Sequence, residues 1–123
     1  MSEPDRSWLL GRVNQALALA GDLMTFDDLV ASARKGTVQI FASDTAFAAT
    51  SLITYPRARQ LDCFLAAGTL RGVLDLEPRL VDFARENDAA TMITFGRAAW
   101  APIAAPLGWR ADAVRYVKRL GVN

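Results

Sequence analysis

The chain has 123 residues, of which 52% are hydrophobic and 22% charged, and its formal net charge is +1. This length and apolar content suffice for a folded core and exclude an intrinsically disordered chain, so we expect one domain over residues 1–123. A nucleic-acid-binding domain usually carries a basic excess on one face, and the near-neutral charge argues against such a partner.

Histidine is absent from the chain, and the only cysteine, Cys63, lies in an apolar run. A Ser-His-Asp triad, a Cys-His pair and a His-ligated metal are therefore excluded within the chain, and we expect no metal. A lone cysteine cannot form a disulfide within the chain and suits a reducing compartment. No apolar run approaches the roughly 20 residues of a membrane helix, so we expect a cytoplasmic protein without a membrane partner.

The first third of the chain has the apolar spacing of two helices. Residues 5–20 place Trp8, Leu9, Val13 and Leu17 on one face, with Gly21 as a stop. The second helix is expected over residues 25–35. Its start is marked by Thr25, which can cap backbone amides, and by Asp27 and Asp28, which suit the positive end of the helix dipole; Gly36 closes it.

The middle of the chain changes to the two-residue period of strands. Residues 38–42 alternate, residues 46–55 are rich in aromatic, Thr and Ile residues, and residues 59–66 place Leu61, Cys63 and Leu65 on one side. Short turns at residues 43–45 and 56–58 join the three segments. We therefore predict an antiparallel meander.

The remaining segments predict an alternation of helices and strands. We expect a short helix over residues 69–76, a second that starts at Pro78 and runs to residue 87, and a third over residues 98–106. The apolar residues 91–95 predict a strand that is central and buried. A helical crossover between strands implies that two neighbouring strands are parallel, so the fold class is α/β (α+β) with a mixed sheet.

The segment of residues 111–120 is compatible with two structures. Val114, Tyr116 and Lys118 alternate as in a strand, whereas Val114, Val117 and Gly121 would suit a helix. Because Val and Tyr prefer strands, we predict a strand.

The order of these elements, together with several short motifs, resembles the GNAT (N-acetyltransferase) superfamily, in particular the small GNAT-like proteins of bacteriophages and prophages. The motifs are Gly36, Pro56-Arg57, Ala66-Ala67-Gly68, Gly96-Arg97-Ala98-Ala99-Trp100 and Leu107-Gly108-Trp109. The resemblance covers residues 25–120. It implies a GNAT-like sheet with an antiparallel meander, a central parallel pair and flanking helices, in a protein of the cytoplasm of a bacterial host.

This resemblance implies acetyl-CoA as a co-substrate and an amine as the acceptor of the acetyl group. The pyrophosphate would bind where the third meander strand passes into a helix, because backbone N–H groups at a helix start bind phosphate without side-chain chemistry. The candidate cofactor-binding residues are Leu65, Ala66, Ala67, Gly68, Thr69, Leu70, Arg71 and Gly72. The alternative for this segment is an ordinary turn from strand to helix.

Four side chains are candidates for the chemistry and the acceptor site. Asp62 stands where GNAT enzymes often place a carboxylate base, and Tyr116 is a candidate acid. Arg97 can hold an anionic group, and Trp100 can line an acceptor pocket. Each has a plainer alternative. Asp62 would then be a solvent-facing strand residue and Tyr116 a structural tyrosine. Arg97 would be a surface arginine and Trp100 a core aromatic.

Two departures from the GNAT pattern support a second interpretation. The spacing of Gly68 and Gly72 differs from that of the superfamily's pyrophosphate loop, and Ala104 stands where a tyrosine commonly protonates the departing thiolate. The alternative is a catalytically inactive interaction module of phage or prophage origin that binds a phage or host protein. The exposed edges of a meander also allow a homodimer.

Overall fold

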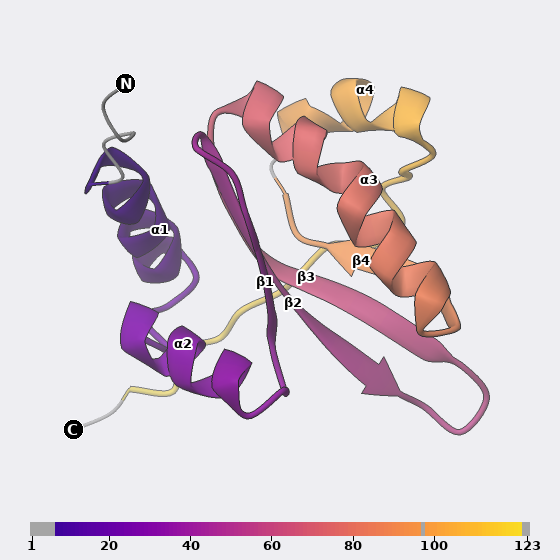
Figure 1. The fold of residues 1–123 in the computed structure, drawn as a ribbon, viewed down its shortest axis with the longest axis horizontal. Helices are drawn as coiled ribbons and strands as arrows, with labels where there is room; N and C mark the ends of the chain where they lie inside the picture. The colour runs from indigo at the N-terminus through magenta and orange to yellow at the C-terminus, as the bar shows by residue number, and fades with distance from the viewer. Residues whose placement is uncertain (1–6, 97, 122–123) are drawn as a thin grey trace.

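The computed structural model describes residues 7–96 and 98–121. A sheet stands between two helical layers (Figure 1). Helices α1 (Ser7–Leu19) and α2 (Phe26–Arg34) lie on one face, and α3 (Leu70–Glu86) lies on the other.

The N-terminal helices follow the predicted pattern. Helix α1 buries Leu9, Val13 and Leu17, one residue in four, as an apolar face requires. At the start of α2 the hydroxyl of Thr25 accepts a hydrogen bond from the amide of Asp28 at 3.1 Å, and the carboxylate of Asp28 accepts one from the amide of Thr25 at 2.8 Å. This capping box confirms the predicted start of α2, and its hydrogen bonds lower the pKa of Asp28.

The sheet has the strand order β1-β2-β3-β4. Strands β1 (Gln39–Ala42), β2 (Ala46–Thr54) and β3 (Arg59–Gly68) form the predicted antiparallel meander. Strand β4 (Ala89–Thr94) lies parallel to β3 and follows the crossover through α3. The predicted fold class, a mixed sheet with a meander, a parallel pair and flanking helices, is confirmed.

Each face of the sheet has its own hydrophobic core. The α1 side gathers apolar residues from α1, α2 and the two central strands, namely Leu9, Val13, Leu17, Leu29, Phe47, Ala49, Leu65 and Ala67. The α3 side is smaller and consists of Ala46, Ala48, Cys63, Leu76 and Leu80. Both central strands therefore contribute to both cores, and their backbone is fixed from two sides.

Helix α3 corrects the prediction of two helices between residues 69 and 87. It is one continuous helix of 17 residues with Pro78 in its interior. A proline removes one helical hydrogen bond and usually ends a helix. The buried residues Gly72, Leu76, Leu80 and Ala84 follow one another at four-residue intervals, whereas Pro78 is exposed. The apolar stripe therefore continues past the proline and holds both halves on the sheet.

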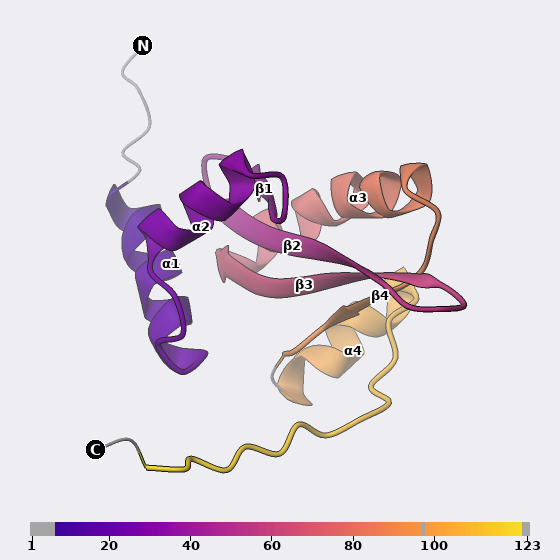
Figure 2. The ribbon, with the colours of Figure 1, turned by 90° about the horizontal axis from the view of Figure 1, so that it is seen from below.

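Two further predictions are wrong in the C-terminal third. Strand β4 was expected to be central and buried, but it is the edge strand of the described sheet, and half of its residues are exposed. Residues 110–121 form no strand or helix and are exposed throughout. A strand needs a neighbour for its backbone groups, and this segment pairs with none of the described strands. Figure 2 shows it running apart from the sheet.

Between β4 and this segment the chain forms short helical turns. These are a 3-10 turn (Ala98–Trp100), helix α4 (Ala101–Ala104) and a second 3-10 turn (Ala105–Leu107). They match the helix predicted for residues 98–106. Gly108 ends them in the left-handed region with φ +92°.

Candidate functional site

The parallel strands β3 and β4 separate part of the way along the sheet. Their pairing runs from Arg59 opposite Ala89 to Cys63 opposite Thr94. At the last pair the hydroxyl of Thr94 donates a hydrogen bond to the carbonyl of Cys63 at 2.8 Å. Strand β4 ends there, whereas β3 continues to Gly68. Beyond Cys63, one edge of β3 pairs with β2, and no described strand pairs with the other.

A bulge in β3 coincides with the point of separation. Ala49 of β2 pairs with Leu65 and Thr50 pairs with Cys63, so Phe64 has no partner in the register. The extra residue turns the following side chains to the opposite face, because Cys63 packs into the α3 core and Leu65 into the α1 core. Backbone groups of β3 are thereby redirected where the sheet opens.

The open edge of β3 leads directly into the start of α3, where two glycines fit against Thr45. Gly68 has φ +120°, and a Cβ atom there would lie 2.2 Å from the carbonyl oxygen of Thr45. A Cβ atom on Gly72 would lie 2.5 Å from Oγ1 of Thr45. The amide of Thr69 also donates to the carbonyl of Thr45 at 3.0 Å. Both glycines are therefore required by packing within the chain.

The first turn of α3 keeps donors for a ligand. The hydroxyl of Thr69 accepts the amide of Gly72 at 3.0 Å, which leaves the amides of Leu70 and Arg71 as the first-turn donors that this cap does not use. The side chain of Arg71 is 87% exposed and contacts Asp75 at 3.3 Å. Such a surface ion pair is weak, so the guanidinium is available to an anion at the helix start.

The other predicted cofactor-binding residues contribute backbone rather than side chains. Leu65 and Ala67 are buried under α1, and Ala66 packs on the α3 side. A ligand in the separation between β3 and β4 would therefore meet the main chain of this stretch.

Asp62 lies one residue before the separation. It pairs in register with Ser51 of β2 and Ile93 of β4. Its Oδ1 atom is buried and has no hydrogen-bond partner within residues 7–96 and 98–121. Burial raises the pKa of Asp62. A partly buried carboxylate with an unused acceptor atom is suited to take a proton from a bound group.

The remaining candidates lie elsewhere. Arg97 is outside the described residues. Trp100 is exposed in the turn after β4. Tyr116 lies in the extended C-terminal segment and forms no hydrogen bond with Asp62. Burial raises the pKa of the Cys63 thiol to about 11, so this cysteine is not a thiolate at neutral pH.

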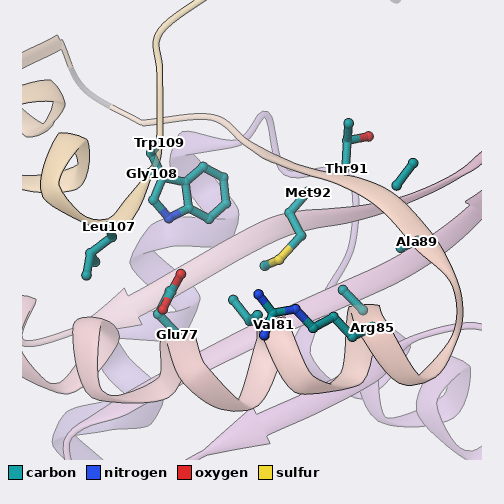
Figure 3. Close-up of a pocket in the computed structure, with 11 residues that line it drawn as sticks. Glu77, Val81, Arg85, Ala89, Thr91, Met92, Leu107, Gly108 and Trp109 are labelled. Carbon is teal, nitrogen blue, oxygen red and sulfur yellow. The ribbon is translucent and has the colours of Figure 1, made fainter.

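A groove that was not predicted lies at the start of β4, at the end away from the separation (Figure 3). It has a volume of about 270 Å³ and runs between α3, β4 and the turn that ends at Trp109. Val81, Met92 and Trp109 give it apolar walls, and Glu77 and Arg85 stand on the α3 side. Its walls come from segments up to 32 residues apart, which no local sequence pattern reveals.

Metal and membrane features were searched in the part of the chain that the structure describes. It contains no group of three or more His, Cys, Asp or Glu residues placed to hold a metal ion. None of its helices has the length and apolar character to cross a membrane.

Comparisons with known proteins identify the fold. No protein-family model and no curated protein matches the sequence. An acetyltransferase of Trypanosoma brucei superposes with a TM-score of 0.64 at 14% identity, over 89% of this chain and 94% of that one. A glucosamine-6-phosphate N-acetyltransferase of Arabidopsis thaliana superposes with a TM-score of 0.65 at 11% identity, over 88% and 90%. A transcriptional regulator of Bacillus halodurans superposes with a TM-score of 0.64 at 9% identity, over 98% and 96%. The chain therefore has a GNAT-like fold.

Proposed function

We propose that the chain binds an acyl-CoA and transfers its acetyl group to an amine. The observation that supports this most strongly is the separation of β3 from β4 after Cys63, with the open edge of β3 leading into the start of α3. The N–H groups of an open strand edge can bind a thioester carbonyl, and those of a helix start can bind a phosphate group. Here the two sets of donors lie side by side. The fold shared with two acetyltransferases of known structure agrees with it.

The phosphate end of acetyl-CoA would lie at the start of α3. The amides of Leu70 and Arg71 would donate to the pyrophosphate, and the helix dipole favours its negative charge. The Arg71 guanidinium would leave Asp75 for the phosphate, a charge-assisted contact stronger than a surface ion pair. Gly68 and Gly72 would support this site by holding the turn against Thr45.

The acetyl end would lie in the separation between β3 and β4. Backbone N–H groups on the open edge of β3 would polarise the thioester carbonyl and stabilise the oxyanion. The amine nitrogen would attack the carbonyl carbon, the C–S bond would break, and the amide product would form as the amine loses a proton. Asp62 would accept that proton, and solvent would protonate the thiolate. Trp100 would contact the acceptor.

Titration calorimetry with acetyl-CoA and with CoA tests the proposal. We expect dissociation constants below about 100 μM, or roughly −5.5 kcal/mol. Arg71→Glu should weaken binding at least tenfold, because it places a negative charge beside the phosphate. Arg85→Glu is the matched control, since it makes the same charge change at the other end of α3, and it should change the affinity less than threefold.

Absence of heat and of a thermal shift at millimolar acetyl-CoA would overturn the proposal. The remaining hypothesis would then be a catalytically inactive module with a GNAT-like fold that binds a protein partner. Binding without turnover of any primary amine in a thiol-release assay would retain the acyl-CoA site and reject the transfer step.

A further inference from the structure

Two backbone carbonyls at the separation of β3 from β4 are occupied by side-chain donors of the chain itself. The hydroxyl of Thr94 donates to the carbonyl of Cys63 at 2.8 Å. The thiol of Cys63 donates to the carbonyl of Leu65 at 3.5 Å, in a buried position. Phe64, the residue without a partner in the register, lies between them in the sequence. The backbone on both sides of the bulge is therefore held by side chains as well as by β2.

The hydroxyl of Thr94 takes the place of a ladder hydrogen bond. In a parallel pair, a carbonyl that faces the neighbouring strand accepts a backbone N–H group of that strand. Cys63 and Thr94 are the last pair of β3 and β4, so no further pair of the ladder follows. A partly buried carbonyl without a donor is costly, and the side chain of Thr94 supplies the donor. Strand β4 can thus leave β3 at this pair while the Cys63 carbonyl stays satisfied.

The occupied carbonyls determine what the open edge of β3 offers to a ligand. A carbonyl oxygen carries partial negative charge, and it would repel the negative charge that develops on a thioester oxygen. A donor bound to the carbonyl reduces this repulsion. Because the peptide group is planar and rigid, a hydrogen bond to the Cys63 carbonyl also fixes the orientation of the Phe64 N–H group and of the backbone that follows. Donors that are fixed before the reaction stabilise an oxyanion best.

We propose that Thr94 is a positioning residue for acetyl transfer, because its hydroxyl holds the Cys63 carbonyl and thereby the backbone donors at the bulge. The inference rests on the proposed acyl-CoA function, and it adds a residue of β4 to a site otherwise built from β3 and α3. Thr94 acts through the backbone and needs no contact with the substrate. A second threonine of β4 provides a matched control where the strands remain paired, since Thr91 donates to Oε1 of Gln60 at 3.0 Å.

NMR relaxation of the unliganded protein tests the positioning. Thr94→Val keeps the shape of the side chain and removes the donor, so the order parameters of the Phe64 and Leu65 amides should fall from about 0.85 to below about 0.6. Thr94→Ser keeps a hydroxyl and should retain the values of the unmodified protein. Thr91→Val removes a hydroxyl from the same strand and should retain them too. Unchanged order parameters in Thr94→Val, or an equal fall in Thr91→Val, would overturn the proposal.

Steady-state release of CoA from acetyl-CoA tests the consequence for catalysis. The acceptor is whichever of spermidine, tyramine and a peptide with a free N-terminus gives the fastest release. Thr94→Val should lower kcat at least about tenfold and keep the KM for acetyl-CoA within about threefold, because the phosphate end still binds at the start of α3. Thr94→Ser should restore kcat to within about threefold, and Thr91→Val should not lower it beyond that range. A loss that appears only in KM would overturn the proposal.

The two tests distinguish failure of the acyl transfer from failure of the role of Thr94. If the unmodified protein neither binds acetyl-CoA nor releases CoA, acyl transfer is rejected, and the catalytic role of Thr94 with it. If the unmodified protein turns over and Thr94→Val keeps full kcat, the role of Thr94 alone is rejected. Rigid amides at Phe64 and Leu65 in Thr94→Val would reject that role whether or not acetyl-CoA binds.

Discussion

Asp62 shows how a single residue links stability to the proposed chemistry. An aspartate in an unfolded chain titrates near pH 3.9, and burial raises the pKa of Asp62 in the folded state. Between these two pKa values the folded chain holds more protons than the unfolded one. The free energy of unfolding is therefore unaffected by Asp62 below the unfolded pKa and falls as the pH rises through the folded pKa.

Asp62→Asn should therefore stabilise the chain relative to the unmodified protein, and increasingly so as the pH rises from 4 to 8. Melting temperatures of both proteins across this range provide the measurement. A difference in melting temperature that does not change with pH would show that the carboxylate is not held in an environment that disfavours its charge.

The same substitution probes catalysis. If Asp62 takes the proton of the amine, kcat/KM of the unmodified protein should rise with pH through the pKa of Asp62, and the variant should lose about 100-fold or more at pH 7. If Asp62 had only a structural role, the pH profile of kcat/KM would have the same shape in the variant as in the unmodified protein. Asp62 would not be the base if the variant kept full activity.

Gly68 and Gly11 form a matched pair of substitutions. Gly68→Ala should lower the free energy of unfolding by at least about 2 kcal/mol, because the new Cβ atom would meet Thr45 at a φ that favours glycine. Gly11→Ala in α1 has no atom within 4 Å of the new Cβ and should raise it by about 0.5–1 kcal/mol. Urea unfolding measures both, and similar effects of the two changes would contradict the packing against Thr45.

At the scale of elements, α3 shows where a local signal misleads. A proline in the first turn is a common helix start, and Pro78 therefore predicts a helix that begins there. The four-residue spacing of Gly72, Leu76, Leu80 and Ala84 crosses the proline and defines one buried face. Burial of this face against the sheet outweighs the hydrogen bond that Pro78 cannot donate.

Pro78→Ala should therefore raise the free energy of unfolding by at least about 1 kcal/mol, since it restores a backbone donor in an exposed position of α3. Asp82→Ala, on an exposed position of the same helix, is the control and should stay within about 0.5 kcal/mol. Thermal unfolding compares the two. A destabilised Pro78→Ala would show that α3 needs the proline to hold its path.

The bulge in β3 was beyond prediction for a different reason. Residues 63–67 are all apolar, so they contain no alternation from which a change of face at Phe64 could be read. The contact of Thr45 with Gly68 and Gly72 joins segments that are distant in the sequence, and no local pattern encodes it. The capping box of α2, in contrast, lies within four consecutive residues. A local pattern therefore predicts where α2 begins.

For the whole molecule, the sequence predicted the two N-terminal helices, the meander and the parallel pair, because each follows from local periodicity and crossover geometry. Its prediction that residues 91–95 form a central strand was wrong, because β4 lies at the edge of the described sheet. The alternation of residues 111–120 indicates a strand, but a strand forms only where a partner edge is available.

Amide hydrogen exchange with and without saturating acetyl-CoA tests the central claim most directly, because it reports whether the ligand binds and where. The account predicts slower exchange within residues 64–72, at the open edge of β3 and the first turn of α3. Unchanged exchange in this segment, or protection confined to the groove between α3 and β4, would contradict it.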